Sequence, residues 1–272
     1  AGKSLSASLD VTGESGPTNT FLKFSVPFQG GSDGINPTIV PQIEENIASD
    51  GTNVFGFDLS TSNTPGTKGY KKALNILSNQ DEYDINMLAL PGILKSIHSS
   101  VTDAAIDMVE NRGDAFYIMD LTQYDDTVST AVNETDGLDT NYAAAYYPWV
   151  RIQGAKGLIW APPSVIVPGV IAKSDQDSHP WFAPAGLNRG RIAVQGVAIN
   201  LNQAERDQLY EARVNPIANF PNVGACIWGQ KTLQLRSSAL DRINVRRLLI
   251  NVKKFIASSS KFLVFEQNTA AT

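Results

Sequence analysis

The alternation of apolar and polar positions is sharpest in the middle of the first half. YKKALNILSN (70–79) predicts a short helix, and DINMLALPG (84–92) predicts a buried strand that ends at a Pro-Gly break. From Ile93 to Gly113 a helix is expected, because apolar residues recur at helical spacing as Ile97, Val101, Ala104, Ala105 and Met108. DAFYIMDL (114–121) predicts a second strand. A strand-helix-strand unit with parallel strands and a right-handed crossover is therefore expected at about 84–120.

Less regular patterns flank this unit. The first 65 residues are rich in Gly, Ser, Thr, Asn and Pro, so only short strands such as Phe21–Val26 and Asn53–Leu59 are expected there. The acidic segment Thr122–Asp139 predicts a surface loop or short helix, whereas AAAYYPWVRI (143–152) has buried character. We place a domain boundary near Arg151.

In the second half the clearest pattern is a helix at Asp241–Ser258. One face is apolar, and the basic residues lie mostly outside it; the apolar set is Val245, Leu248, Leu249, Val252, Phe255 and Ile256. In LNQAERDQLYEARVN (201–215), Asn202 and Glu205 are spaced as a capping box, which predicts a helix of about three turns. APPSVIVPGVIA (161–172) favours an edge strand and turn, since prolines flank its β-branched run, and KFLVFE (261–266) predicts a strand.

The expected fold class combines α/β and α+β character, with two domains, mixed sheets and flanking helices. Residues 1–150 are expected to form an acidic α/β domain and residues 151–272 a basic α+β domain, and the first 20 or so residues are candidates to pair with the second. The net charge is −13 in the first half and +8 in the second, against −5 for the chain. Such a subunit attracts copies of itself head to tail, although two domains that neutralise each other explain the split equally well.

Candidate catalytic groups are few. The two histidines, His98 and His179, lie in no nucleophile-base motif, and the single cysteine, Cys226, sits in an apolar segment typical of a buried thiol. Asp175 and Asp177 alternate with His179 in SDQDSHPW, but the glycine and distal glutamate of a calcium loop are missing. We therefore predict no enzymatic activity, no metal site and no cofactor.

The carboxylates Asp84, Asp114 and Asp120 keep one enzymatic alternative open. They lie near the ends of predicted strands, where an α/β fold often places its site, so an α/β hydrolase-like or metal-dependent enzyme would use them. Capping of strands and helices explains the same residues. No stretch approaches the roughly 18 apolar residues of a membrane span, so direct membrane insertion is not expected.

Several motifs, taken in order, resemble the phage tail sheath family. They run from GYKKALNILSNQDEYDINMLALPGI through DAFYIMDL, NYAAAYYPWV, PPSVIVPGVIAKSD, WFAPAGLNRG, VNPIANFPNVGACIWGQKTL and INVRRLLINVKKFI to VFEQN, covering about Gly66 to Asn268. Each motif is weak alone. The Pro-Gly after a buried strand, YYPW, the WxAPAG loop, NPI…GxxxWGxxT and NVRR are specific as a set.

The resemblance implies a non-enzymatic structural subunit. Copies would form stacked hexameric rings, a helical tube around the tail tube, which contracts to drive that tube through the host envelope during genome ejection. The implied partners are further copies, the tail tube protein, the baseplate and the tail terminator. The implied location is the virion tail sheath, after assembly in the host bacterial cytoplasm. Family members carry terminal arms before and after these motifs, so the chain is expected to be a core fragment lacking them. The sheath of a phage-derived injection machine is a related alternative.

Within such an assembly we expect a subunit interface on the basic helix face. It would contact the acidic surface of neighbouring subunits through Arg242, Arg246, Arg247, Lys253 and Lys254. Together with Lys261, the same residues would also suit a nucleic-acid-binding module with steeply salt-dependent binding. Because the chain is net acidic and shows no motif for stacking bases, no nucleic-acid partner is expected.

Overall fold

The computed structural model describes residues 59, 61–155 and 157–267. Its first elements are α2 (Pro65–Leu77), β1 (Met87–Leu94), α3 (Ser99–Arg112) and β2 (Phe116–Asp120), and β1 and β2 pair in parallel. The predicted strand-helix-strand unit is thus confirmed. The expected strand Phe21–Val26, and all of Asn53–Leu59 except its last residue, lie outside the described residues.

The larger sheet takes strands from both halves of the chain. Its order is β1-β2-β3-β7-β8, with β3 at Ala143–Tyr147, β7 at Val214–Phe220 and β8 at Gly224–Ile227. The first four strands are parallel and β8 is antiparallel to β7. A second sheet, β5-β4-β6, contains β4 (Val150–Gln153), β5 (Leu158–Ala161) and β6 (Gly196–Val197). The larger sheet takes strands from both sides of the expected boundary near Arg151, and that boundary stays a prediction.

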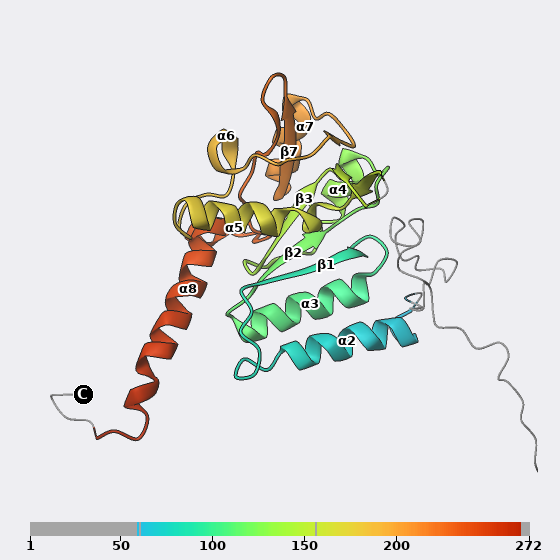
Figure 1. Ribbon diagram of the computed structural model, residues 1–272. Helices are drawn as coiled ribbons and strands as arrows, with labels where there is room; N and C mark the ends of the chain where they lie inside the picture. Colours follow the sequence, from blue (N-terminus) through green and yellow to red (C-terminus); the bar gives the residue numbers. More distant parts are fainter. Residues whose placement is uncertain (1–58, 60, 156, 268–272) are drawn as a thin grey trace, which may run out of the picture. The chain divides into compact units, whose positions relative to one another are not determined.

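Helices cover both faces of the larger sheet (Figure 1). Side chains of β2 alternate between two cores, so Tyr117 and Met119 face one side while Phe116 and Ile118 face the other. The first core also receives α2, α3, α4 (Val128–Asn133) and α7 (Gln203–Glu211). The second receives α5 (Val167–Asp177) and the start of α8 (Ile243–Ser260). Both faces are buried, as expected of parallel strands.

The edge strand expected at residues 161–172 is wrong. A 3₁₀ turn, Pro163–Val165, follows β5 there and leads into α5. Both prolines that argued for a strand end, Pro163 and Pro168, stand in the first turn of a helical element, where a missing N–H costs nothing. The β-branched run between them supplies Val167, which is fully buried.

The boundaries of α3 were half right. Gly113 ends the helix in the left-handed conformation, at φ 64°, as predicted. The start is Ser99 rather than Ile93, because β1 continues through the Pro-Gly pair to Leu94. Gly92 has φ 84°, and the pairing with β2 shifts register between Ala89 and Leu94. The expected break is therefore an irregularity inside the strand.

Of the remaining predicted elements, some are confirmed and one is wrong. α7 forms with its capping box, in which Asn202 accepts from the Glu205 amide and the Glu205 carboxylate accepts from the Asn202 amide. The segment 122–139 contains the short helix α4. KFLVFE is not a strand but the 3₁₀ turn Lys261–Leu263 and the residues that follow it. Two further short elements are α6 (Gly186–Arg189) and the 3₁₀ turn Ala239–Asp241. Among the described residues, no helix has the length and hydropathy to cross a bilayer.

Candidate subunit interface

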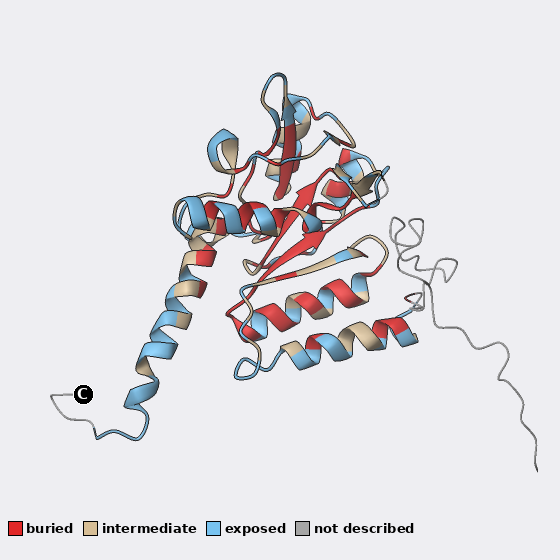
Figure 2. Cartoon of the chain, in the orientation of Figure 1, coloured by how far each residue is buried: buried red, intermediate tan, exposed pale blue. Residues whose placement is uncertain are grey.

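The predicted helix at 241–258 forms as α8, but its faces are inverted. The buried residues are Ile243, Ile250 and the two arginines Arg246 and Arg247, whereas Val252 and Phe255 from the apolar face are exposed. In Figure 2 the helix is buried near its start and exposed along its far half. Helical periodicity correctly separates two faces, but it does not determine which one packs against the protein.

Arg246 and Arg247 are buried because each has a specific partner. The Arg247 guanidinium donates to both carboxylate oxygens of Asp175 on α5, with Nη1 to Oδ1 at 3.0 Å. The Arg246 guanidinium carbon lies 4.1 Å from the centre of the Tyr142 ring, and Nη2 donates to Oδ1 of Asn141. A bidentate carboxylate and an aromatic face are the partners that a guanidinium suits best.

The two lysines bind the first half of the same chain. Lys254 Nζ donates to Asp84 Oδ1 at 2.5 Å and to the Ile85 carbonyl at 2.7 Å. Lys253 Nζ donates to the carbonyls of Arg112 and Gly113, at 3.2 and 3.3 Å, where α3 ends. A cation at a helix C-terminus is favoured by the helix dipole. The Lys254 hydrogen bond and charge lower the pKa of Asp84.

Arg242 stands at the start of α8 beside Tyr210. Its Nη1 donates to the Tyr210 hydroxyl, and its Nε lies 3.2 Å from Oδ1 of Asp241. Lys231 Nζ lies 4.2 Å from the centre of the same Tyr210 ring and donates to the Tyr210 carbonyl.

The structure thus brings all five predicted interface residues into contact with their own chain. The attraction between basic and acidic halves operates at least partly within one subunit, through Lys254 and Asp84. A role for the five in contacts between subunits stays a prediction.

The exposed apolar side of α8 is the feature that sequence reasoning missed. A signal was available: Arg246, Arg247, Lys253 and Lys254 recur at seven-residue spacing, as regularly as the apolar set. This spacing defines a second, basic stripe along the helix. Such a stripe can pack against a surface that offers carboxylates, carbonyl oxygens and aromatic rings. Those partners come from elements distant in sequence, so the stripe alone could not identify them.

The candidate catalytic residues each have a structural contact. His98 is buried before α3 and accepts from the Leu94 amide through Nδ1 at 3.1 Å. His179 stacks on Trp181 with ring centres 4.4 Å apart. Asp175 and Asp177 lie in α5 rather than in a loop, and Asp177 pairs with Lys173. Within the described part of the chain, no three His, Cys, Asp or Glu side chains cluster as metal ligands would.

Each strand-end carboxylate binds a different structural partner. Asp114 binds Arg112, whose side chain is itself almost fully buried, with Nε to Oδ1 at 2.8 Å and Nη2 to Oδ2 at 3.0 Å. Asp120 accepts from the Ser164 amide at 3.0 Å and from the Ser164 hydroxyl at 2.5 Å. Burial raises the pKa of Asp120 to about 7, against the effect of these hydrogen bonds. Asp120 therefore anchors the 3₁₀ turn at Pro163–Val165 to the end of β2.

The NPI…WG motif positions the turn after β8 against β7. Asn215 Oδ1 accepts from the Lys231 amide at 2.6 Å, and its Nδ2 donates to the carbonyls of Ala145 and Lys231. A Cβ at position 229 would lie 2.9 Å from Asn215 Oδ1 and 3.1 Å from Asn215 Cα, so only glycine fits. Asn215 and Gly229 thus hold the turn after β8 against β7, and Cys226 in β8 is a buried thiol.

Sheath proteins of contractile tails account for this set of structural motifs. A family model described as the phage tail sheath protein central domain matches residues 66–233, so the chain belongs to the phage tail sheath family. The match extends from α2 to the segment after Gly229 and includes all the strands of the larger sheet.

Particular relatives come from several phages. The tail sheath protein of Vibrio phage KVP40 is 43% identical over 114 residues, which are 42% of this chain and 17% of the relative. The tail sheath protein of Enterobacteria phage T4 is 42% identical over the same shares. That of Salmonella phage ViI is 29% identical over 253 residues, 82% of this chain and 40% of the relative. The chain therefore spans less than half the length of these curated relatives.

Solved structures with the same fold are parts of contractile machines. The anti-feeding prophage baseplate gives a TM-score of 0.62 at 23% identity, over 79% of this chain and 55% of that one. The sheath complex of PVC, an extracellular contractile injection system, in its contracted state gives 0.51 at 27% identity, over 61% and 47%. The mixed α/β fold expected from the sequence is thus confirmed.

Proposed function

We propose that the protein is a structural subunit of a contractile phage tail sheath. The observation that carries this proposal is the match of the sheath central domain to residues 66–233, which includes every strand of the larger sheet. In the proposed role, copies polymerise as hexameric rings into a helical tube around the tail tube. They meet the baseplate at one end and the tail terminator at the other. The virion tail is then the site of function, and the host bacterial cytoplasm the site of assembly.

Contraction in this proposal needs no catalytic site. An extended lattice can be a kinetically trapped arrangement, and shortening a rigid-body move of subunits to better interfaces. The candidate carboxylates Asp84, Asp114 and Asp120 all hold structural partners, which supports a non-enzymatic role. Hydrolytic activity lost in Asp120→Ala, with the fold preserved, would instead favour the enzymatic alternative.

The experiment is electron microscopy of the full-length gene product under assembly conditions. Uniform tubes of constant diameter that shorten and widen after a chemical or thermal trigger are expected. A full-length product that stays monomeric at all concentrations and salts tested would contradict the proposal.

A role for the basic residues in subunit contacts is also proposed and can be tested where it does not disturb folding. Arg246 and Arg247 are buried in their own chain, so their reversal would confound assembly with stability. Arg242 is more accessible, with a side chain 40% exposed. Arg242→Glu is expected to impair tube formation, and normal tubes from this variant would remove Arg242 from the interface.

The sheath of a phage-derived injection machine is the second candidate. It is supported by the similarity to the PVC sheath complex and the anti-feeding prophage. The phage proteins reach higher identity over their shorter matches, which favours the phage sheath. Identification of a capsid or of a toxin-loaded tube in the purified particle would decide between the two.

A further inference from the structure

Asp120, the last residue of β2, binds the 3₁₀ turn at Pro163–Val165 in the interior of the protein. Asp120 is 2% exposed, and Ser164, in the middle of the turn, is 1% exposed. Oδ1 of Asp120 accepts from the Ser164 amide at 3.0 Å, and Oδ2 lies 2.5 Å from the Ser164 hydroxyl oxygen. Both carboxyl oxygens therefore bind the same residue of the turn.

These two hydrogen bonds are the polar link between the turn and the larger sheet. The amides of Val165 and Ile166 donate to the carbonyls of Pro162 and Pro163, within the turn itself. The two prolines have no N–H group to donate. Among the described residues, no backbone hydrogen bond joins residues 162–166 to a strand of the larger sheet. The turn can therefore leave the sheet without breaking any strand pairing, once its bonds to Asp120 are lost.

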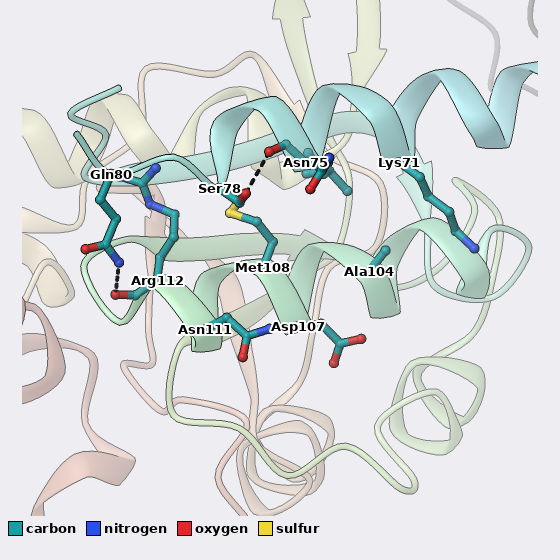
Figure 3. Close-up of a pocket in the computed structure, with 10 residues that line it drawn as sticks. Lys71, Asn75, Ser78, Gln80, Ala104, Asp107, Met108, Asn111 and Arg112 are labelled. Carbon is teal, nitrogen blue, oxygen red and sulfur yellow. Dashed lines mark hydrogen bonds between the residues drawn. The ribbon is translucent and has the colours of Figure 1, made fainter. Parts of the chain in front are cut away.

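The Asp120 carboxylate has no counter-ion. Within the described part of the chain, no lysine, arginine or histidine forms an ion pair with it. By contrast, the buried Asp114 carboxylate binds the Arg112 guanidinium. Figure 3 shows Arg112 at the end of α3, where its carbonyl oxygen accepts from Gln80. A buried carboxyl group without a cation favours its protonated form, and burial raises the pKa of Asp120 to about 7.

The titratable groups on the neighbouring elements do not supply the missing charge. Opposite Asp120 stand Leu94 of β1 and Tyr146 of β3. Burial raises the pKa of Tyr146, and also that of Tyr117 in β2, so both phenols stay neutral. Three cations on the elements around this end of β2 have carboxylate partners of their own, as Lys95–Asp103, Lys173–Asp177 and Arg247–Asp175.

We propose that Asp120 and Ser164 form a latch controlled by one proton. With the carboxyl group protonated, Oδ2–H donates to Ser164 Oγ while Oδ1 accepts from the amide, so both oxygens keep a partner. When the proton is lost, the Ser164 hydroxyl reverses and donates, but the charge stays buried without a counter-ion. Release of the turn then lets water reach the carboxylate and loosens the connection between β5 and α5. The latch lies within one chain and does not depend on the proposed sheath function.

Hydrogen exchange with mass spectrometry tests the latch in the full-length gene product, kept unassembled at low concentration. Protection of residues 163–171, corrected for the intrinsic exchange rate, should fall about tenfold per pH unit from about pH 5 to 7. Above that range it should level off, because the closed state is then ionised as well. Peptides from β7 exchange through global unfolding, so residues 163–171 should show lower protection and a weaker dependence on low urea concentrations.

Two variants assign the titration to this pair. Asp120→Asn imitates the protonated carboxyl group, since its amide nitrogen donates to Ser164 Oγ and its oxygen accepts from the Ser164 amide. Protection in this variant should not change with pH. Ser164→Ala removes the hydroxyl that lowers the pKa of Asp120, so protection should keep falling above the pH at which the parent levels off.

Three results would overturn the latch. Protection that does not change with pH in the parent means that the carboxyl group does not control the turn. The same slope in Asp120→Asn means that another group titrates; protonation of His98, whose Nδ1 accepts from the Leu94 amide, would act with the opposite sign, lowering protection as pH falls. Equal protection and equal urea dependence in residues 163–171 and β7 mean that the turn opens only when the whole chain unfolds.

Discussion

The larger sheet and α8 bury their side chains by opposite rules. In β2 and β3 every residue is buried, and nearly all of them are apolar. In α8, Arg246 and Arg247 are buried while Phe255 and Ile256 face solvent. The difference lies in the partners that each element meets: the sheet meets apolar helices, whereas α8 meets Asp175, Tyr142 and the carbonyls that end α3. Burial follows the available partners, and hydrophobicity is a guide only where those partners are apolar.

Arg112 is where the two rules meet, since this buried charge lies at the end of α3, a helix that packs on the sheet. Its guanidinium binds Asp114 and donates to the carbonyls of Leu77 and Tyr83, which joins α2 and the loop before β1 to the end of α3. Arg112→Met should lower the free energy of unfolding by about 3–5 kcal/mol, because it leaves the Asp114 carboxylate buried and unpaired. Urea unfolding measures this.

A matched control for Arg112 is Arg236→Met, which alters an exposed arginine and should change stability by less than about 0.5 kcal/mol. A loss below about 1 kcal/mol in Arg112→Met would mean that the buried network is not needed, and that α2 is held by its apolar contacts alone.

Asp120 is a buried charge without a cationic partner in its hydrogen bonds. Its folded-state pKa of about 7 lies above the value expected in the unfolded chain, so its ionisation destabilises the fold as pH rises from about 4 to 7. Asp120→Asn should therefore gain stability relative to the parent by about 2–4 kcal/mol between pH 4 and pH 8. Thermal unfolding across this range measures the change. A flat difference for Asp120→Asn would place the carboxyl in a solvated setting.

Much of the sheet was predictable and the α8 environment was not, for a physical reason. DAFYIMDL specifies its strand locally, since β-branched and aromatic residues in a short run leave no competing structure. The left-handed Gly113 and the Asn202–Glu205 capping box are local as well. By contrast, the contacts that bury Arg246 and Arg247 come from residues 72 to 105 positions away.

The strand expected from the prolines at 161–172 was wrong because a proline is compatible with two different local structures. Pro163 and Pro168 mark either a strand edge or a helix start, and the sequence between them does not distinguish the two. What decides is the carboxylate of Asp120, which accepts from Ser164 in the first turn and comes from a strand 44 positions earlier. The partners of the candidate interface residues likewise depended on the folded chain, so the sequence alone could not identify them.

A substitution at Gly229 tests the packing of the larger sheet, and its expected effect on stability is smaller. Gly229→Ala places a Cβ 2.9 Å from Asn215 Oδ1 and 3.0 Å from Pro216 Cδ, so stability should fall by about 1–3 kcal/mol. Gly169→Ala is the matched control. Nothing lies within 4 Å of its added Cβ, and α5 should gain up to about 1 kcal/mol from better helix propensity. Equal effects of the two variants in chemical unfolding would mean that the Asn215 turn yields without cost.

Substitution of Lys254 should change the unfolding free energy least, and it tests most directly how α8 is held. Lys254→Met removes the contacts with Asp84 and Ile85 at a partly exposed site, so the unfolding free energy should fall by only about 0.5–1 kcal/mol. Hydrogen exchange is the sharper readout, because residues 251–260 should lose protection while the sheet keeps it. Lys261→Met, at an exposed position past the helix, is the control.

The pH and salt dependence of this contact has a defined sign. Lys254 lowers the folded-state pKa of Asp84, so the contribution is present above the unfolded value of about 4 and is lost as pH falls below it. High salt should weaken it in the parent and leave Lys254→Met unchanged. If protection of residues 251–260 were the same in both proteins at every pH and salt, Lys254 would not position α8. The position of α8 would then be set by the Arg247–Asp175 pair and by Arg246 on Tyr142.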